Sequence, residues 1–203
     1  MSQETTQKKV GLGLAFKRVA KGAAALGAVG ALVLGGASVA NADVTGGHVD
    51  AVSINAANDI GSKFDSTHAS WPLSASDSRF VFSGGGVSCT GGVYSIASFP
   101  ATAPSVGFNN DAGTGKNSYV IALDAVTSGQ SAAFDGPGSQ DLNTSGTDLT
   151  LAAGGHIHGS WTLNSGTGSC ATGGVDFPLE FSAEEIGGSA NYDDQVITFR
   201  VVI

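Results

Sequence analysis

The segment Gly154–Trp161 reads GGHIHGSW and carries two of the four histidines in the 203-residue chain. Side chains of an extended strand alternate between its two faces. His156, His158 and Ser160 would therefore share one face, while Trp161 points to the other and can anchor in a core through its indole ring. The segment predicts a strand with one polar, imidazole-bearing face and one buried face.

The sequence beyond residue 42 indicates an all-β fold. It has almost no helical periodicity and consists of short β-branched and aromatic runs separated by Gly, Ser, Asn and Asp. Apart from a short helical turn at 182–186, we expect strands at 48–55, 79–83, 92–97, 119–126, 131–134, 148–152, 156–163, 175–181 and 195–202. About nine strands without a long crossover helix predict an antiparallel, immunoglobulin-like β-sandwich.

Residues 1–42 are predicted to be a secretory signal peptide. Five basic residues precede an uncharged run rich in Ala, Gly, Leu and Val, and Ala40-Asn41-Ala42 supplies a small-x-small cleavage pattern. The alternative is an uncleaved transmembrane anchor, since the run is long enough to cross a bilayer. Cleavage would leave 43–203 as a single secreted β-sandwich domain without a stable membrane span.

The charge of the exported part excludes one class of partner. Removing the leader takes away five of nine basic side chains and one of 17 acidic ones, which leaves four and 16 and a net charge of −12 with His neutral. A surface this acidic repels phosphate backbones, so nucleic acid is not an expected partner. The charge suits an extracellular protein or one that attracts cations.

Cys89 and Cys170 are the only cysteines, and both lie in the exported part. An even count in an oxidising compartment predicts a disulfide between them. The alternative, metal ligation by thiolates, would require that both cysteines stay reduced.

A second histidine motif, at Gly47-His48-Val49-Asp50, places His48 and Asp50 on one strand face. His48 with Asp50 and His156 with His158 are therefore two polar pairs, and each pair follows two glycines. If the two strands that carry the pairs lie side by side, the four side chains can form one site with nitrogen and oxygen ligands. Imidazoles and a carboxylate suit a transition metal, with Zn²⁺ or Cu²⁺ the first expectation and Mn²⁺ or Fe²⁺ compatible. The alternative is that these histidines only hydrogen-bond at strand ends.

The two histidine motifs resemble those of the actinobacterial surface-anchored repeat family, also called the choice-of-anchor M domain. Gly47-His48-Val49-Asp50 is similar to its opening motif, and residues 155–161 are similar to its late Gly-His-x-His-x-Asn-Trp motif, with Ser160 in place of Asn. The resemblance spans most of 43–203, and it implies a cell-surface role and an association with metal-type transporters. The turn after the Trp and the C-terminal anchor of the family are missing.

These observations predict a secreted, cell-surface-associated protein that is not an enzyme and that binds a transition metal. No nucleophile elbow or His-Glu-x-x-His helix supports a hydrolase. The alternative is a structural or adhesive module that recognises envelope components or forms a homo-oligomer through strand edges, such as that of the apolar C-terminal strand.

A third hypothesis, a carbohydrate-binding module, rests on Trp71, Tyr94 and Tyr192. His68 is expected to be an exposed loop residue.

Overall fold

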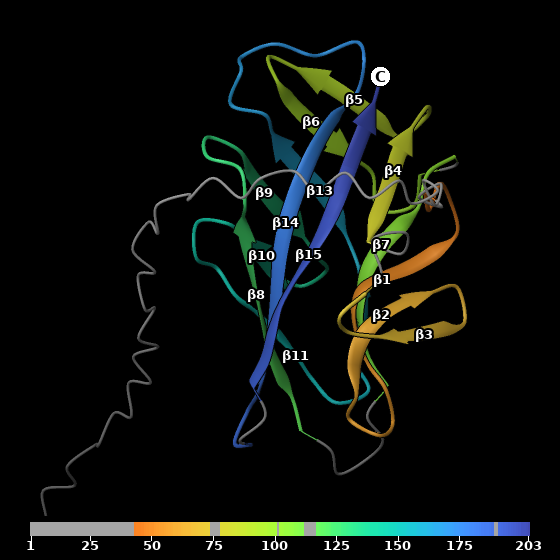
Figure 1. Cartoon of the computed structure of the whole chain (residues 1–203), viewed down its shortest axis with the longest axis vertical. Coiled ribbons are helices and arrows are strands. Elements are labelled where there is room, and N and C mark those ends of the chain that lie inside the picture. The colour runs from red at the N-terminus through yellow and green to blue at the C-terminus, as the bar shows by residue number, and fades with distance from the viewer. Residues whose placement is uncertain (1–42, 74–77, 101, 112–116, 189–190) are drawn as a thin grey trace, which may run out of the picture. The chain divides into compact units, whose positions relative to one another are not determined.

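The computed structural model describes residues 43–73, 78–100, 102–111, 117–188 and 191–203 (Figure 1). The predicted signal peptide, residues 1–42, lies outside them. The described residues belong to a unit that spans Ser38–Ile203, and they form strands and no helix. The strands are β1 (His48–Ile54), β2 (Ile60–Phe64), β3 (Thr67–Ser70), β4 (Arg79–Ser83), β5 (Val87–Thr90), β6 (Val93–Ile96), β7 (Ser105–Asn110), β8 (Tyr119–Ala125), β9 (Ser131–Asp135), β10 (Asp141–Asn143), β11 (Leu149–Leu151), β12 (His156–His158), β13 (Ser160–Asn164), β14 (Val175–Glu185) and β15 (Asn191–Val202).

The strands form three five-stranded sheets. The first sheet has the order β12-β7-β1-β2-β3, the second β10-β9-β13-β6-β5, and the third β11-β8-β14-β15-β4. All neighbours are antiparallel except two parallel pairs, β1 with β7 and β4 with β15. The all-β, mostly antiparallel character predicted from the sequence is confirmed.

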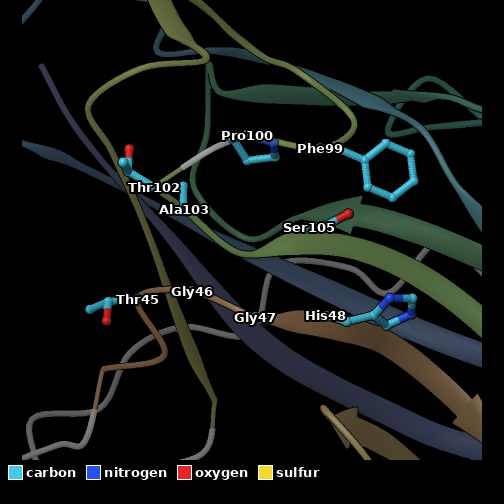
Figure 2. A pocket seen from close by; sticks show the side chains of 9 residues that line it. All are labelled: Thr45, Gly46, Gly47, His48, Phe99, Pro100, Thr102, Ala103 and Ser105. Atoms are coloured by element: carbon cyan, nitrogen blue, oxygen red, sulfur yellow. The ribbon is translucent and has the colours of Figure 1, made fainter.

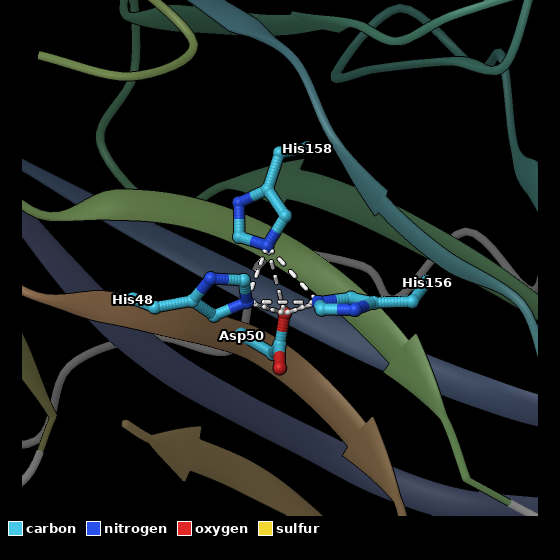
Figure 3. A group of neighbouring side chains, drawn as sticks. All are labelled: His48, Asp50, His156 and His158. Atoms are coloured by element: carbon cyan, nitrogen blue, oxygen red, sulfur yellow. Dashed lines mark hydrogen bonds and ion pairs between the residues drawn. The ribbon is translucent and has the colours of Figure 1, made fainter. Parts of the chain in front are cut away.

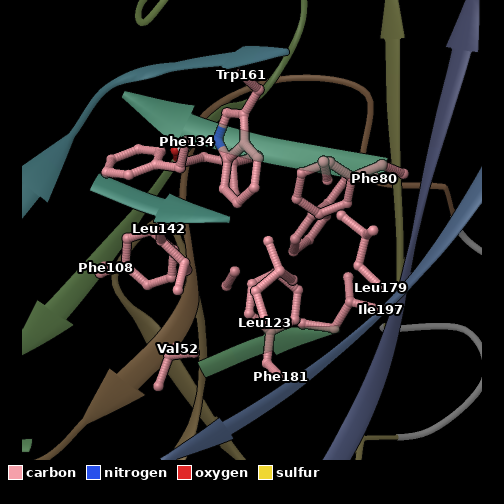
Figure 4. Packing of buried hydrophobic residues seen from close by; sticks show 14 of the residues in the cluster. Val52, Phe80, Phe108, Leu123, Phe134, Leu142, Trp161, Leu179, Phe181 and Ile197 are labelled. Carbon is pink, nitrogen blue, oxygen red and sulfur yellow. Dashed lines mark hydrogen bonds between the residues drawn. The ribbon is translucent and has the colours of Figure 1, made fainter. Parts of the chain in front are cut away.

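One hydrophobic core joins the three sheets, and Trp161 contacts aromatic rings from each of them (Figure 4). The indole is 1 % exposed and lies next to Phe134 of its own sheet, Phe108 of the first and Phe199 of the third, with ring centroids 5.1, 6.0 and 4.9 Å away. Burial of such a ring contributes roughly 4–6 kcal/mol. The indole nitrogen donates a hydrogen bond to the Val106 carbonyl at 3.1 Å. The predicted anchoring role of Trp161 is confirmed.

The predicted strand 156–163 is in fact two strands in different sheets. β12 pairs with β7 in the first sheet, and β13 pairs with β6 and β9 in the second. The chain changes sheets at Gly159, where an added Cβ would lie 2.2 Å from the Asp135 carbonyl oxygen. Glycine is therefore required for this close passage, and the break separates Ser160 from the histidine face of β12.

The described residues contain more strands than the nine expected. The sequence pattern missed β2, β3, β5, β7 and β10, most of which are short or rich in Ser, Gly and Asn. The helical turn expected at 182–186 was wrong, because β14 continues to Glu185 and pairs with β8 along this stretch. The apolar face of the last strand is confirmed by buried Ile197, Phe199 and Val201, but β15 lies between β14 and β4 and is not an edge strand.

A disulfide joins Cys89 of β5 to Cys170, which precedes β14, as predicted from the cysteine count. The two residues are 81 positions apart in the sequence. The bond therefore connects the edge strand of the second sheet to the segment that leads into the third.

Replacing both cysteines, in Cys89→Ala/Cys170→Ala, should lower the free energy of unfolding by about 4–5 kcal/mol, because the unfolded chain regains the entropy of a long open loop. Urea unfolding of the purified protein and the variant measures this difference. A loss below about 1 kcal/mol would show that the crosslink does not restrict the unfolded chain as the entropic account requires.

Candidate metal centre

Strand β7 brings the two histidine motifs together from distant parts of the chain. It pairs in parallel with β1, where Asp50 lies opposite Gly107, and antiparallel with β12, where His158 lies opposite the same glycine. Residues i and i+2 share a strand face. Hence His48 and Asp50 from one side of β7 converge with His156 and His158 from the other (Figure 3). The register of the two ladders places Gly107 between the two pairs.

The missing side chain of Gly107 makes room for the cluster. A Cβ at this position would lie 2.7 Å from the His158 ring and 2.2 Å from the Ile157 carbonyl oxygen. Any larger residue would push against both the imidazole and the backbone of β12. Gly107 is therefore a positioning residue of the site, although it offers no ligand atom.

The four side chains point their donor atoms at one common point. The Nε2 atoms of the three histidines are 2.7 Å (His48–His158), 2.8 Å (His48–His156) and 3.1 Å (His156–His158) apart. The Asp50 Oδ1 atom lies 3.9, 3.3 and 3.5 Å from the Nε2 atoms of His48, His156 and His158. The convergence expected of a metal site is present.

These six distances define an irregular tetrahedron. The point equidistant from its four corners lies inside it, about 2.0 Å from each donor atom, which matches Zn–N bonds of about 2.0–2.1 Å and Zn–O bonds of about 2.0–2.2 Å. The distance from this point to the donor atoms is too short for Ca²⁺, which binds its oxygen ligands at about 2.3–2.6 Å. The residues present thus fit a first-row transition metal.

Asp50 carries a buried carboxyl group. It is 0 % exposed, and neither of its oxygens accepts a hydrogen bond from the part of the chain that the structure describes. Burial raises the pKa of Asp50 to about 7, an effect that the charge of Lys63 opposes and that of Asp111 reinforces. A buried carboxylate without hydrogen bonds is unfavourable unless a positive charge compensates it.

Two of the three histidines, His156 and His158, have lowered pKa values that favour the neutral form, which is the form that binds a metal. Burial lowers the pKa of His158 to about 4, with further lowering by His48 and His156. The pKa of His156 is also lowered, first by burial and then by the charges of His48 and Lys63. Metal ligation requires deprotonated imidazole nitrogens, and these shifts favour that state near neutral pH.

A second layer of hydrogen bonds orients His158. Its Nδ1 atom is 3.0 Å from the Ser105 hydroxyl, and that hydroxyl donates to the Ser98 carbonyl at 2.6 Å. Because the hydroxyl proton is used on Ser98, the Nδ1–H of His158 donates to the Ser105 oxygen. The Nε2 atom then keeps its lone pair for a metal, as second-layer partners of metal-binding histidines commonly arrange.

A charged group borders the cluster on the side of β2. Lys63 lies opposite Asp50 in the register of β1 and β2, and its ammonium group is 3.0 Å from the Asp111 carboxylate. Asn109, opposite His156 in β7, donates to the same carboxylate at 2.8 Å. Burial would raise the pKa of Asp111, but the hydrogen bonds from Lys63 and Asn109 outweigh it and lower that pKa.

The cluster is partly open to solvent. The side chains of His48 and His156 are 43 % and 42 % exposed, whereas His158 is 6 % exposed and lies beside the ring of Phe99, 5.6 Å away between centroids. An open groove of about 390 Å³ borders the site and is lined by His48, Phe99 and Ser105 among others (Figure 2). Of the four converging residues only His48 lines this groove, so the groove adjoins the centre and does not contain it.

Other residues singled out from the sequence lie elsewhere. His68 is not an exposed loop residue: it lies in β3, 19 % exposed, with its Nε2 atom 3.3 Å from the Asp59 carboxylate. Tyr94 is fully buried and accepts a hydrogen bond from the Ala171 amide, so it cannot stack on a sugar. Trp71 is partly buried and donates to Ser62, and the side chain of Tyr192 is outside the described residues.

Sequence reasoning found the four converging residues and missed their supports. Gly107, Ser105 and Asn109 lie on β7, which was not predicted, and Lys63 lies on β2, which was also missed. The alternation of Val106 and Phe108 with small or polar residues was the available signal for β7. No family model, curated protein or solved structure matches this chain.

The buried carboxyl group predicts an unusual response to Asp50→Asn in the metal-free protein. The pKa of Asp50 is about 7 in the folded state and near 3.8 in the unfolded state, so ionisation costs folding free energy progressively as the pH rises through this range. The variant should therefore be more stable than the wild type at pH 8, by on the order of 2–4 kcal/mol, with a smaller gain at pH 5.

Urea unfolding of chelator-treated proteins at the two pH values measures the effect. Asp176→Asn is the matched control, since Asp176 is an exposed acid paired with Arg200 in the third sheet and should show no such gain. An equal change for Asp50→Asn at pH 5 and pH 8 would contradict the prediction.

Proposed function

We propose that the protein is a secreted, non-enzymatic, cell-surface-associated β-sandwich protein that binds one transition-metal ion through His48, Asp50, His156 and His158. The observation that carries the proposal is the convergence of three imidazole nitrogens and one carboxylate oxygen on a point about 2.0 Å from each, which is the length of a zinc–ligand bond. The metal would neutralise Asp50 and be held by all four side chains.

The donor set favours Zn²⁺ or Cu²⁺. Imidazole nitrogen suits Zn, Cu, Ni and Fe, whereas Mg²⁺ and Ca²⁺ prefer oxygen ligands alone. Both cysteines are joined in the disulfide and offer no thiolate. Among divalent first-row metals, the affinity of a nitrogen-rich site rises toward Cu²⁺ and remains high for Zn²⁺.

The alternative, in which the histidines only join strand ends, explains the cluster less well. Three Nε2 atoms lie within 3.1 Å of one another, and at least one of them, that of His158, presents a lone pair. Lone pairs brought this close repel each other unless a proton or a cation lies between them. A purely structural role also leaves the buried Asp50 carboxylate without a hydrogen bond from the described residues.

The surface location is proposed on several independent features. The basic and apolar leader in 1–42 is typical of export, and the disulfide is compatible with an oxidising compartment. Within the described part of the chain no helix has the length and hydropathy to cross a bilayer. The two histidine motifs are the basis on which we propose membership of the surface-anchored repeat family. That membership would bring with it an immunoglobulin-like arrangement of the sheets. It would also make components of the cell envelope the expected partners. Homo-oligomers would then form through edge strands other than β15.

Metal loading tests the proposed function directly. The purified protein should bind about one equivalent of Zn²⁺ or Cu²⁺ and unfold at a higher temperature when loaded, because a ligand that binds only the folded state stabilises it. The variant His156→Ala/His158→Ala should lose both effects. Elemental mass spectrometry and thermal unfolding measure them.

His68→Ala is the matched control, because His68 is the one histidine outside the cluster. It should bind metal as the wild type does. Absence of stoichiometric metal in the wild type after loading with Zn²⁺, Cu²⁺ and Mn²⁺ would refute the proposal, as would unchanged binding by the double variant.

Metal binding should also release a proton, and the number released should depend on pH. Below pH 7 the Asp50 carboxyl group is mostly protonated and must lose its proton to become a ligand. We expect close to one proton per Zn²⁺ from Asp50 at pH 6 and a small fraction at pH 8, so affinity falls as the pH drops below 7. Calorimetry in two buffers of different ionisation enthalpy counts these protons. Release that does not change between the two pH values would contradict the role of Asp50.

A further inference from the structure

We propose that the metal ion keeps a fifth coordination position for a small anion, on the face of the cluster bounded by His48, His156 and Asp50 and flanked by Lys63. This inference rests on the proposed metal-binding function and adds a class of ligand to it. Its support comes from the unequal spacing of the donor atoms, from their exposure and from the charge beside them.

The spacing of the donor atoms leaves one wide opening. A regular tetrahedral site with bonds of about 2.0–2.1 Å has donor separations of about 3.3 Å. The imidazole nitrogens are closer to each other than this, at 2.7–3.1 Å, and therefore crowd one side of the centre. The widest separation is 3.9 Å, between His48 Nε2 and Asp50 Oδ1. Zinc is known to expand from four to five ligands in some sites, and this opening leaves room for the fifth.

The exposure of the ligands shows from which side a further ligand can enter. The wide opening borders two faces of the tetrahedron, one completed by His156 and the other by the buried His158. His158 lies beside Phe99 and is 6 % exposed, whereas His48 and His156 are both more than 40 % exposed. Asp50 is fully buried and belongs to both faces, so the exposed corners decide between them. A small molecule from solvent would therefore pass His48 and His156 and reach the metal through the His48–His156–Asp50 face, opposite His158.

The charge at this face selects an anion. A divalent metal with three neutral imidazoles and one carboxylate keeps a net charge of about +1. Lys63 adds a second positive charge on the same sheet face, since it lies directly across from Asp50 in β2. Asp111 partly compensates Lys63 through an ion pair whose carboxylate is 52 % exposed. The metal centre and Lys63 thus supply two positive charges, against one negative charge on the exposed carboxylate of Asp111. The net positive charge attracts anions locally, although the chain as a whole is acidic.

Cobalt and azide provide the test. Co²⁺ replaces Zn²⁺ and gives visible absorption bands that report the number of ligands, and azide is a small anion that coordinates metals. Titration of the Co²⁺-loaded protein with azide at constant ionic strength should give a saturable loss of absorption as the metal goes from four to five ligands. Lys63→Gln should weaken azide binding about three- to fivefold, in keeping with the strength of a partly exposed charge pair.

Two further variants separate the local effect from net charge. Asp111→Asn frees Lys63 and should strengthen azide binding. Arg200→Gln removes a positive charge in the third sheet, where Arg200 pairs with Asp176, and should leave azide binding unchanged. Equilibrium dialysis of Co²⁺ fixes the metal concentration that saturates each variant, and azide is titrated at that concentration, so that a change in metal affinity caused by the charge of Lys63 or Asp111 does not enter the azide constant. Arg200→Gln should keep a metal affinity within about twofold of the wild type, because Arg200 pairs with Asp176 in the third sheet and is outside the cluster.

Failure of this inference and failure of the proposed function have different signatures. If Co²⁺ binds but azide produces no saturable change, or if Lys63→Gln behaves like Arg200→Gln, the fifth position is overturned and metal binding stands. If Co²⁺ does not bind the wild type at all, both are overturned. A gain of azide affinity in Asp111→Asn together with a loss in Lys63→Gln supports the site as drawn.

Discussion

The buried charge of Asp50 is the constraint on which the centre depends. Its carboxylate lies in the middle of the first sheet, fully buried and without a hydrogen bond from the described residues, and burial raises its pKa to about 7. Leaving such a group ionised costs several kcal/mol. Three imidazole nitrogens next to it can offset that cost by sharing a cation with it. No described residue hydrogen-bonds this carboxyl group, so a bound cation would stabilise it in its ionised form.

The rest of the structure holds the donor atoms in place around that charge. β7 is buried along its whole length and pairs with both ligand-bearing strands, so the register of two ladders sets the distance between the histidine motifs. Trp161 fixes β7 to the core by a hydrogen bond to the carbonyl of Val106, which adjoins Gly107. A site supported by strands and a packed core needs little rearrangement to bind its ligand.

The four residues of the candidate site were predictable from the sequence, and their surroundings were not. His48, Asp50, His156 and His158 stand out because a spacing of two residues places each pair on one strand face. Nothing in β7 marks it as the strand between them, since Ser105, Gly107 and the asparagines conceal its alternation. The chain changes sheets at Gly159 because the backbone of β9 lies very close to this residue. The contact joins residues far apart in the sequence, so the spacing of neighbouring residues does not predict it. Register and the second layer around the ligands follow only from tertiary packing.

The same connections show that the metal is not needed to join the strands. A structural metal site typically supplies crosslinks that a small fold lacks. Here β1 and β12 are already joined through β7 by backbone hydrogen bonds, one core spans all three sheets, and the disulfide connects the second sheet to the start of β14. A metal would add little as a crosslink, and its main effect on stability would be the neutralisation of Asp50. A buried carboxylate that weakens the metal-free fold therefore fits the proposed binding role better than a role in folding.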